Sequence, residues 1–146
     1  MAIGGSIKIS IVTNAFNQGR FLADALQSVL TQGWQELEYL VVDPGSTDNT
    51  AEIIHDFQQR YPGRIVHIVE RDKGPADGLN KAFAKATGEI FGYLNADDYY
   101  LPGCFREAVQ AVNNFPNGVF KMFINPRPVI IITEFKNPSI KEKCSA

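Results

Sequence analysis

The sequence predicts an α/β domain in which a mostly parallel sheet is flanked by helices. Between residues 7 and 107, short runs of β-branched and aromatic residues alternate with amphipathic segments of helical period, which is the pattern of strand–helix units. Polar, turn-forming clusters come directly after several of the strand-like runs. A chain of 146 residues also buries roughly 70% of its unfolded surface, which is enough for one packed core.

The first half of the chain predicts three strands, over residues 7–13, 37–42 and 65–69, separated by two helices. Each helix is indicated by apolar residues at spacings that place them on one face, which we expect to cover the sheet. These residues are Phe21, Leu22, Ala25, Leu26, Val29 and Leu30 in the first helix and Ile53, Ile54, Phe57 and Tyr61 in the second.

The second half predicts one further strand, over residues 89–94, between two more helices. Pro75 suits the first turn of the third helix, and Gly88 is a natural C-terminal stop for it. Pro102 is expected to open the fourth helix. The inward residues of these helices are Leu79, Ala82, Phe83 and Ala86 in the third and Phe105, Ala108, Val109 and Val112 in the fourth.

The regular pattern weakens near the C-terminus, so we divide the chain into a core over residues 1–113 and a divergent tail over residues 114–146. Within the tail, residues 129–133 are compatible with a short strand, and the polar residues from 137 onward predict a frayed end. We find no internal repeat and no low-complexity segment.

The composition excludes several classes of partner. The 14 basic and 16 acidic residues give a net charge of −2, which disfavours binding to nucleic acid or to an anionic membrane. The two cysteines form no CxxC pair, and His55 and His67 lack the spacing of a zinc site on one helix. No apolar run is long enough to span a bilayer, so we expect a reduced, cytoplasmic protein without a transmembrane segment.

Two adjacent carboxylates, Asp97 and Asp98, follow the fourth predicted strand directly. Their mutual repulsion makes shared ionisation costly unless a cation intervenes, and Mg²⁺ or Mn²⁺ commonly takes one or two protein carboxylates together with substrate phosphates. The alternative is that one of the two only caps the helix expected near Pro102. Because ligands of open α/β sheets bind outside the carboxyl ends of the strands, we expect this acidic loop to lie at the site.

A second polar cluster, Asp43 to Asp48, follows the second predicted strand. The Asp43 carboxylate is suited to accept a hydrogen bond from the imide N–H of uracil or thymine, but Asp-Pro-Gly-Ser is also an ordinary turn sequence. Asp48, with Asn49 and Glu52, fits helix capping better than catalysis.

Other polar residues near the predicted strand ends have similar alternatives. Thr13 and Asn14, after the first strand, are candidates to contact a base or ribose, or are ordinary loop formers. Lys73 suits a phosphate, although a lone loop lysine is usually solvated. Asn80, early in the third helix, turns either toward a ligand or toward water. The chain has no GxGxxG, GxxxxGK[ST], HExxH or GxSxG motif, so dehydrogenase, P-loop and serine hydrolase functions lose support.

Taken together, four segments in this order and spacing resemble family 2 glycosyltransferases of the GT-A fold, a Rossmann-like sheet. The resemblance covers about residues 7–109. The segments are Lys8-Ile-Ser-Ile-Val-Thr13; Val41-Val-Asp-Pro-Gly-Ser-Thr-Asp48; Asp72-Lys-Gly74 with Asn80-Lys81; and Ala86-Thr-Gly-Glu-Ile-Phe-Gly-Tyr-Leu-Asn-Ala-Asp-Asp98.

The resemblance implies an inverting transferase that moves a sugar from a nucleotide-diphosphate sugar, with a UDP-sugar as first choice, to a glycan or lipid-linked acceptor. It implies a role in cell-surface polysaccharide or glycan synthesis, in the cytoplasm or at the inner face of the membrane. Asp98 and Asp97 would form the DxD-type motif that holds Mg²⁺ or Mn²⁺. The implied donor-binding residues are Thr13, Asn14, Asp43, Gly45, Lys73, Asn80 and Asp97.

The chain departs from the family pattern in several places. Asn95 stands where many relatives have the leading acid of the motif, Pro44 replaces an acid or glycine, and Leu79 stands where some have arginine. The acceptor-binding half and its catalytic base find no match after Asn113, so the chain is expected to be truncated after the DxD-type motif. The alternative hypotheses are a non-catalytic nucleotide-binding module or inactive remnant and, more weakly, a nucleotidyltransferase.

Overall fold

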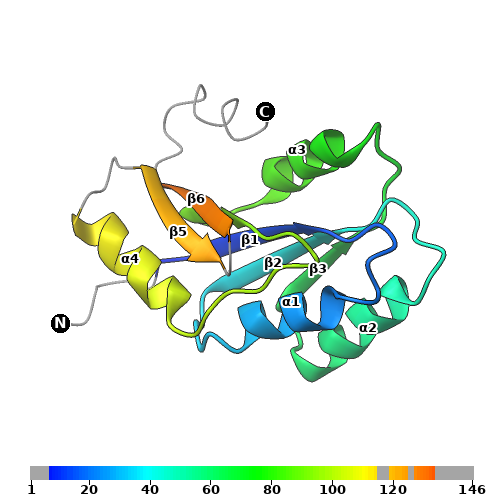
Figure 1. The fold of residues 1–146 in the computed structure, drawn as a ribbon, viewed down its shortest axis with the longest axis horizontal. Helices are drawn as coiled ribbons and strands as arrows, with labels where there is room; N and C mark the ends of the chain where they lie inside the picture. The colour runs from blue at the N-terminus through cyan, green and yellow to red at the C-terminus, as the bar shows by residue number, and fades with distance from the viewer. Residues whose placement is uncertain (1–6, 115–118, 125–126, 134–146) are drawn as a thin grey trace.

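The structure, a computed structural model, describes residues 7–114, 119–124 and 127–133 and contains one six-stranded sheet with helices on both faces (Figure 1). The sheet has the strand order β3-β2-β1-β4-β6-β5. The elements in chain order are β1 (Ile9–Asn14), α1 (Leu22–Leu30), β2 (Leu37–Val42), α2 (Thr50–Arg60), β3 (Ile65–Ile68), α3 (Pro75–Lys85), β4 (Ile90–Tyr93), α4 (Cys104–Asn114), β5 (Val119–Ile124) and β6 (Arg127–Thr133).

The first four strands are parallel, as the alternating pattern predicts, and β1 lies between β2 and β4. From β1 the chain moves outward to β2 and β3, and then returns to the other side of β1 to form β4. The strand order therefore reverses at β1. In open α/β sheets such a reversal is where ligands bind, outside the carboxyl ends of the strands.

Alternating residues along the strands build two apolar layers, one on each face of the sheet. The larger layer packs against α1, α2 and α4 and includes Ile11, Tyr39 and Leu94, which are 2% exposed or less. The smaller layer lies under α3 and joins Val12 and Leu40 to Ala82 of that helix. Burial of these apolar side chains on both faces supplies the main favourable free energy of folding.

Two strands close the sheet beyond β4. Strand β6 runs antiparallel to β4 and contains residues 129–133, for which a strand was expected. Strand β5 pairs with β6 as the outer strand and was not foreseen. The expected frayed end from residue 137 onward lies outside the described residues. None of the helices in the described part of the chain has the length and apolarity needed to cross a membrane.

The structure corrects two predicted helix boundaries. Helix α4 begins at Cys104, two positions after Pro102. Helix α3 ends at Lys85, and Gly88 is not its C-terminal stop. Gly88 lies against β1, where its N–H donates to the Ser10 hydroxyl at 2.8 Å. A Cβ at this position would lie 2.8 Å from the Ser10 backbone nitrogen and 2.9 Å from the Lys8 carbonyl oxygen. This close approach of two backbones requires glycine.

We therefore predict that Gly88→Ala lowers the free energy of unfolding by about 1 to 3 kcal/mol, because the methyl group would force β1 and the segment before β4 apart. Urea unfolding followed by circular dichroism measures the change. Where a glycine can be replaced without strain, alanine usually stabilises a protein through the unfolded state. A stabilised Gly88→Ala variant would therefore contradict the close approach.

Candidate functional site

The loops after β1, β2 and β4 meet at the carboxyl edge of the sheet. In the parallel register Asn14 pairs with Val42 of β2, and Val12 pairs with Tyr93 of β4. Neighbouring strands are about 4.8 Å apart, so the ends of β2 and β4 are separated by roughly 10 Å across β1. The polar loops that follow these strands are thus brought within the span of one small ligand.

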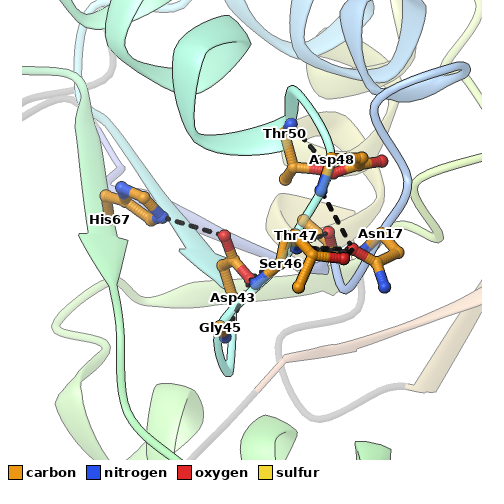
Figure 2. A network of polar contacts seen from close by, with 9 residues as sticks. Asn17, Asp43, Gly45, Ser46, Thr47, Asp48, Thr50 and His67 are labelled. Carbon is orange, nitrogen blue, oxygen red and sulfur yellow. Dashed lines mark hydrogen bonds and ion pairs between the residues drawn. The ribbon is translucent and has the colours of Figure 1, made fainter.

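Asp43, at the end of β2, is 2% exposed, and one of its carboxylate oxygens is fully engaged by its own turn (Figure 2). Oδ1 accepts hydrogen bonds from the backbone N–H groups of Gly45 at 3.1 Å and Ser46 at 2.7 Å. The Ser46 hydroxyl donates to the same oxygen at 2.7 Å. Asp43 can therefore be a turn residue and still bind a base, because the turn uses Oδ1 and leaves Oδ2 for another partner.

Oδ2 of Asp43 faces His67, a residue that was not among the predicted site residues. The distance to His67 Nε2 is 3.7 Å. Burial lowers the pKa of His67, and the Asp43 carboxylate opposes this effect. His67 Nε2 is itself buried and has no hydrogen-bond partner within the described ranges. Strand alternation places His67 on the Asp43 face only once the parallel register pairs Val41 with His67, and the sequence alone carries no signal for that register.

The turn after β2 is fastened to the loop after β1 by Asn17 (Figure 2). Asn17 has a φ of 49°, a left-handed conformation that asparagine tolerates better than most residues. Its N–H donates to the Ser46 hydroxyl at 2.8 Å, and its Oδ1 accepts the Thr47 N–H at 2.8 Å. The chain of contacts from Asn17 through Ser46 to Asp43 holds the two loops in one arrangement.

Asp48 continues this network and accepts hydrogen bonds at the start of α2, although the N-cap residue is Asn49, whose side chain makes no capping hydrogen bond. Asp48 accepts the N–H and hydroxyl of Thr50 at the start of the helix, and also the N–H of Gly19 from the other loop. The Thr50 hydroxyl, followed by these backbone donors, lowers the pKa of Asp48. Asp48 is therefore occupied by structural contacts.

The acidic loop after β4 holds Asp98 and Asp97 in different environments. Asp98 is 9% exposed, and its Oδ2 accepts a hydrogen bond from Asn95 Nδ2 at 3.1 Å, whereas Asp97 is exposed. The Tyr93 hydroxyl donates to Asn95 Oδ1, which orients the amide so that its NH₂ group faces Asp98. Burial, followed by the charges of Asp97 and Asp98, raises the pKa of Tyr93, so this hydroxyl stays protonated.

This loop offers only oxygen ligands, the kind that Mg²⁺ and Mn²⁺ prefer. Among the described residues no group of three or more histidine, cysteine or acidic side chains is placed to hold a metal ion. The residues present therefore fit an ion held by two carboxylates at most, with phosphate oxygens and water completing its coordination. The coordination of the ion would therefore be complete only when the substrate is bound.

The side chains of Thr13 and Asn14 lie on opposite faces of the sheet, because consecutive residues of a strand alternate in direction. The Thr13 side chain is fully buried, and its hydroxyl lies 2.8 Å from the Tyr39 hydroxyl in the core. This side chain is therefore engaged in the core, and the contact of Thr13 with a base or ribose stays a prediction. Asn14 points to the α3 side, where its Nδ2 donates to the Pro75 carbonyl at 3.1 Å.

The segment at the start of α3 is also close to the strand ends. Gly78 approaches so closely that a Cβ there would lie 2.6 Å from Asp72 Oδ2 and 3.4 Å from Asn14 Oδ1. Lys73 and Asn80 are both exposed, so they lie on the surface and not inside a formed pocket. Asp77 accepts the Lys73 N–H at 2.9 Å and so ties the first turn of α3 to the loop that precedes it.

Comparison with known proteins supports one family. A family model described as glycosyl transferase family 2 matches residues 10–129, which extends beyond the segment that carries the motif resemblance. An uncharacterized glycosyltransferase of Nostoc sp. is 36% identical over 71% of this chain, which covers 32% of that protein. A poly-beta-1,6-N-acetyl-D-glucosamine synthase of Staphylococcus epidermidis is 36% identical over 61% of this chain and 21% of its own length.

Solved structures with the same fold include two complexes with nucleotide sugars. The structure of S. aureus TarS residues 1–349 in complex with UDP-GlcNAc has a TM-score of 0.69 and 24% identity, over 77% of this chain and 33% of that one. The mannosyltransferase PcManGT of Pyrobaculum calidifontis in complex with GDP-Man and Mn²⁺ has a TM-score of 0.68 and 25% identity, over 80% of this chain and 35% of that one. The chain thus spans about a third or less of these matched proteins.

The buried contact between Thr13 and Tyr39 leads to a stability prediction. Thr13→Val should lower the free energy of unfolding by about 1 to 3 kcal/mol, because the Tyr39 hydroxyl is left buried without its partner. Adding Tyr39→Phe removes that hydroxyl, so the double variant should lose less than the sum of the two single variants. Urea unfolding of all three variants measures the coupling, and strict additivity would contradict it.

The contact between Asn95 and Asp98 leads to a second prediction. Asn95→Asp replaces the donor facing Asp98 with a carboxylate and should lower the free energy of unfolding by about 1 to 2 kcal/mol at pH 7. The Tyr93 hydroxyl can donate to an asparagine or an aspartate at position 95. Only the contact with Asp98 therefore changes, from attraction to repulsion. The difference from wild type should shrink as the pH falls below about 4, where carboxylates become protonated. Urea unfolding at pH 7 and pH 3.5 checks this, and a difference independent of pH would refute it.

Proposed function

This chain belongs to glycosyl transferase family 2, and we propose that its carboxyl edge binds the nucleotide diphosphate of a sugar donor. The observation that carries the proposal is the convergence of three loops, which places Asp43 and Asp98 on opposite sides of Asn14. One end of the edge is suited to a base and the other to a metal-bound diphosphate. Because the chain spans about a third or less of the matched proteins, the activity of the whole enzyme is part of this proposal.

The base end consists of Asp43 and the loops that hold it. Since Oδ1 accepts three donors from the turn, the oxygen proposed to accept a base N–H is Oδ2. Uracil, thymine and guanine each offer such an N–H beside a carbonyl. The UDP-GlcNAc bound by TarS and the GDP-Man bound by PcManGT carry two of these bases, which supports the assignment, and we take a UDP-sugar as first choice. Asn14 and the backbone near Gly45 are proposed to contact the base or ribose.

The metal end consists of Asp98, assisted by Asp97. We assign Asp98 as the direct ligand of Mg²⁺ or Mn²⁺, because Asn95 holds this carboxylate in place. A bound ion would stabilise the negative charge that develops on the leaving diphosphate. The Mn²⁺ in the PcManGT structure supports a metal of this kind. Lys73 and Asn80, both exposed beside the edge, are proposed to reach phosphate oxygens once the donor is bound.

The reaction proposed for the whole enzyme is transfer of the sugar to an acceptor hydroxyl with inversion. Inversion needs a general base within hydrogen-bond reach of that hydroxyl, and we assign none of the described residues to this role. The relationship to a poly-beta-1,6-N-acetyl-D-glucosamine synthase supports a glycan or lipid-linked acceptor in cell-surface polysaccharide synthesis. We place this reaction in the cytoplasm or at the inner face of the membrane.

Isothermal titration of UDP with and without MnCl₂ tests the donor site. We expect Mn²⁺-dependent binding of UDP, and we expect Asp98→Asn to weaken it by roughly 100-fold, or about 2.7 kcal/mol. Asp56→Asn is the matched control, because Asp56 is an exposed acid of α2 paired with Arg60, and it should leave binding unchanged. Absence of metal-dependent heat with UDP, GDP and dTDP would refute the proposed function.

A further inference from the structure

The pair formed by Asp43 and His67 carries an inference that rests on the proposed function and deepens it. Asp43 has one oxygen saturated by Gly45 and Ser46 and one, Oδ2, that faces His67. A carboxylate oxygen has two lone-pair sites, so Oδ2 can accept one hydrogen bond from the protein and one from a ligand. Any base that binds to Asp43 Oδ2 therefore lies beside the His67 imidazole.

His67 is positioned for this role by the sheet. It lies on β3, where it pairs with Val41 of β2, and it faces Asp43, the residue that follows the end of β2. Its Nε2 is buried without a hydrogen-bond partner in the described part of the chain. A buried N–H without a partner is costly, and the nearest acceptor recorded for it is Asp43 Oδ2 at 3.7 Å. A shift of less than about 1 Å would form a charge-assisted hydrogen bond.

We propose that His67 is the positioning residue of base recognition. Its Nε2–H hydrogen bonds to Asp43 Oδ2 and thereby directs the remaining lone pair of that oxygen toward the N–H of a uracil, thymine or guanine base. Because Asp43 is only 2% exposed, this recognition requires the residues that cover the pair to move aside when the nucleotide binds. His67 therefore affects affinity for the base and leaves affinity for the diphosphate unchanged.

Calorimetric titrations with UDP and with inorganic pyrophosphate, both in MnCl₂, separate this role from a general structural one. His67→Leu removes the donor and should weaken UDP binding roughly tenfold while changing pyrophosphate binding less than about twofold. His67→Gln keeps an N–H donor and should retain UDP affinity within about threefold of wild type. His55→Leu is the matched control, since His55 is an exposed histidine on α2, and it should change neither ligand.

The outcomes distinguish the inference from the proposed function. If wild type binds UDP but His67→Leu weakens UDP and pyrophosphate equally, or weakens neither, the inference is overturned and the proposed function stands. If wild type binds no nucleotide in the presence of Mn²⁺, both fail. Should His67→Leu not fold, ¹⁵N NMR of the wild-type imidazole decides. A proton on Nε2 and a shift with UDP but not with pyrophosphate support the inference, and an Nδ1–H tautomer or no shift overturns it.

Discussion

The parallel pairing of β1 with β2 on one side and β4 on the other is the constraint on which the site depends. It sets the register in which Asn14, Asp43 and the acidic loop end at one edge, although Asp97 follows Asn14 by 83 residues in the chain. The close backbone approach at Gly88 allows the segment before β4 to reach β1 in that register. A slip by one residue would exchange the two faces of a strand and turn its polar end away from the edge.

Around Asp43 the same carboxylate is used for structure and for the proposed recognition. Three turn donors fix Oδ1, and Asn17 and Ser46 connect that turn to the loop after β1. This arrangement holds Asp43 before any ligand arrives, so less conformational freedom is lost on binding. It also leaves Oδ2 as the single oxygen through which Asp43 and His67 can meet a base.

The acidic loop differs from the Asp43 turn, because it supplies only part of the ligand set that the proposed metal ion would need. The neutral Asn95 side chain donates a hydrogen bond to Asp98, which stabilises that carboxylate. With fewer anionic ligands, the proposed metal binding would depend more strongly on the phosphates of the donor. Metal and nucleotide are therefore expected to bind together, with each increasing the affinity for the other.

The sequence by itself determined the four parallel strands, the helix faces, the family and the two acidic segments, because each is recorded in local periodicity or in a contiguous motif. It also indicated that Asp48 has a structural role at the start of α2, where it accepts the Thr50 N–H. Only the tertiary structure decided that Thr13 turns into the core toward Tyr39, that Gly88 packs on β1, and that His67 faces Asp43. It likewise added β5 and placed the expected strand, β6, beside β4. These features depend on which strands are neighbours and in what register, and pairing between distant segments leaves no periodic signal in a single chain.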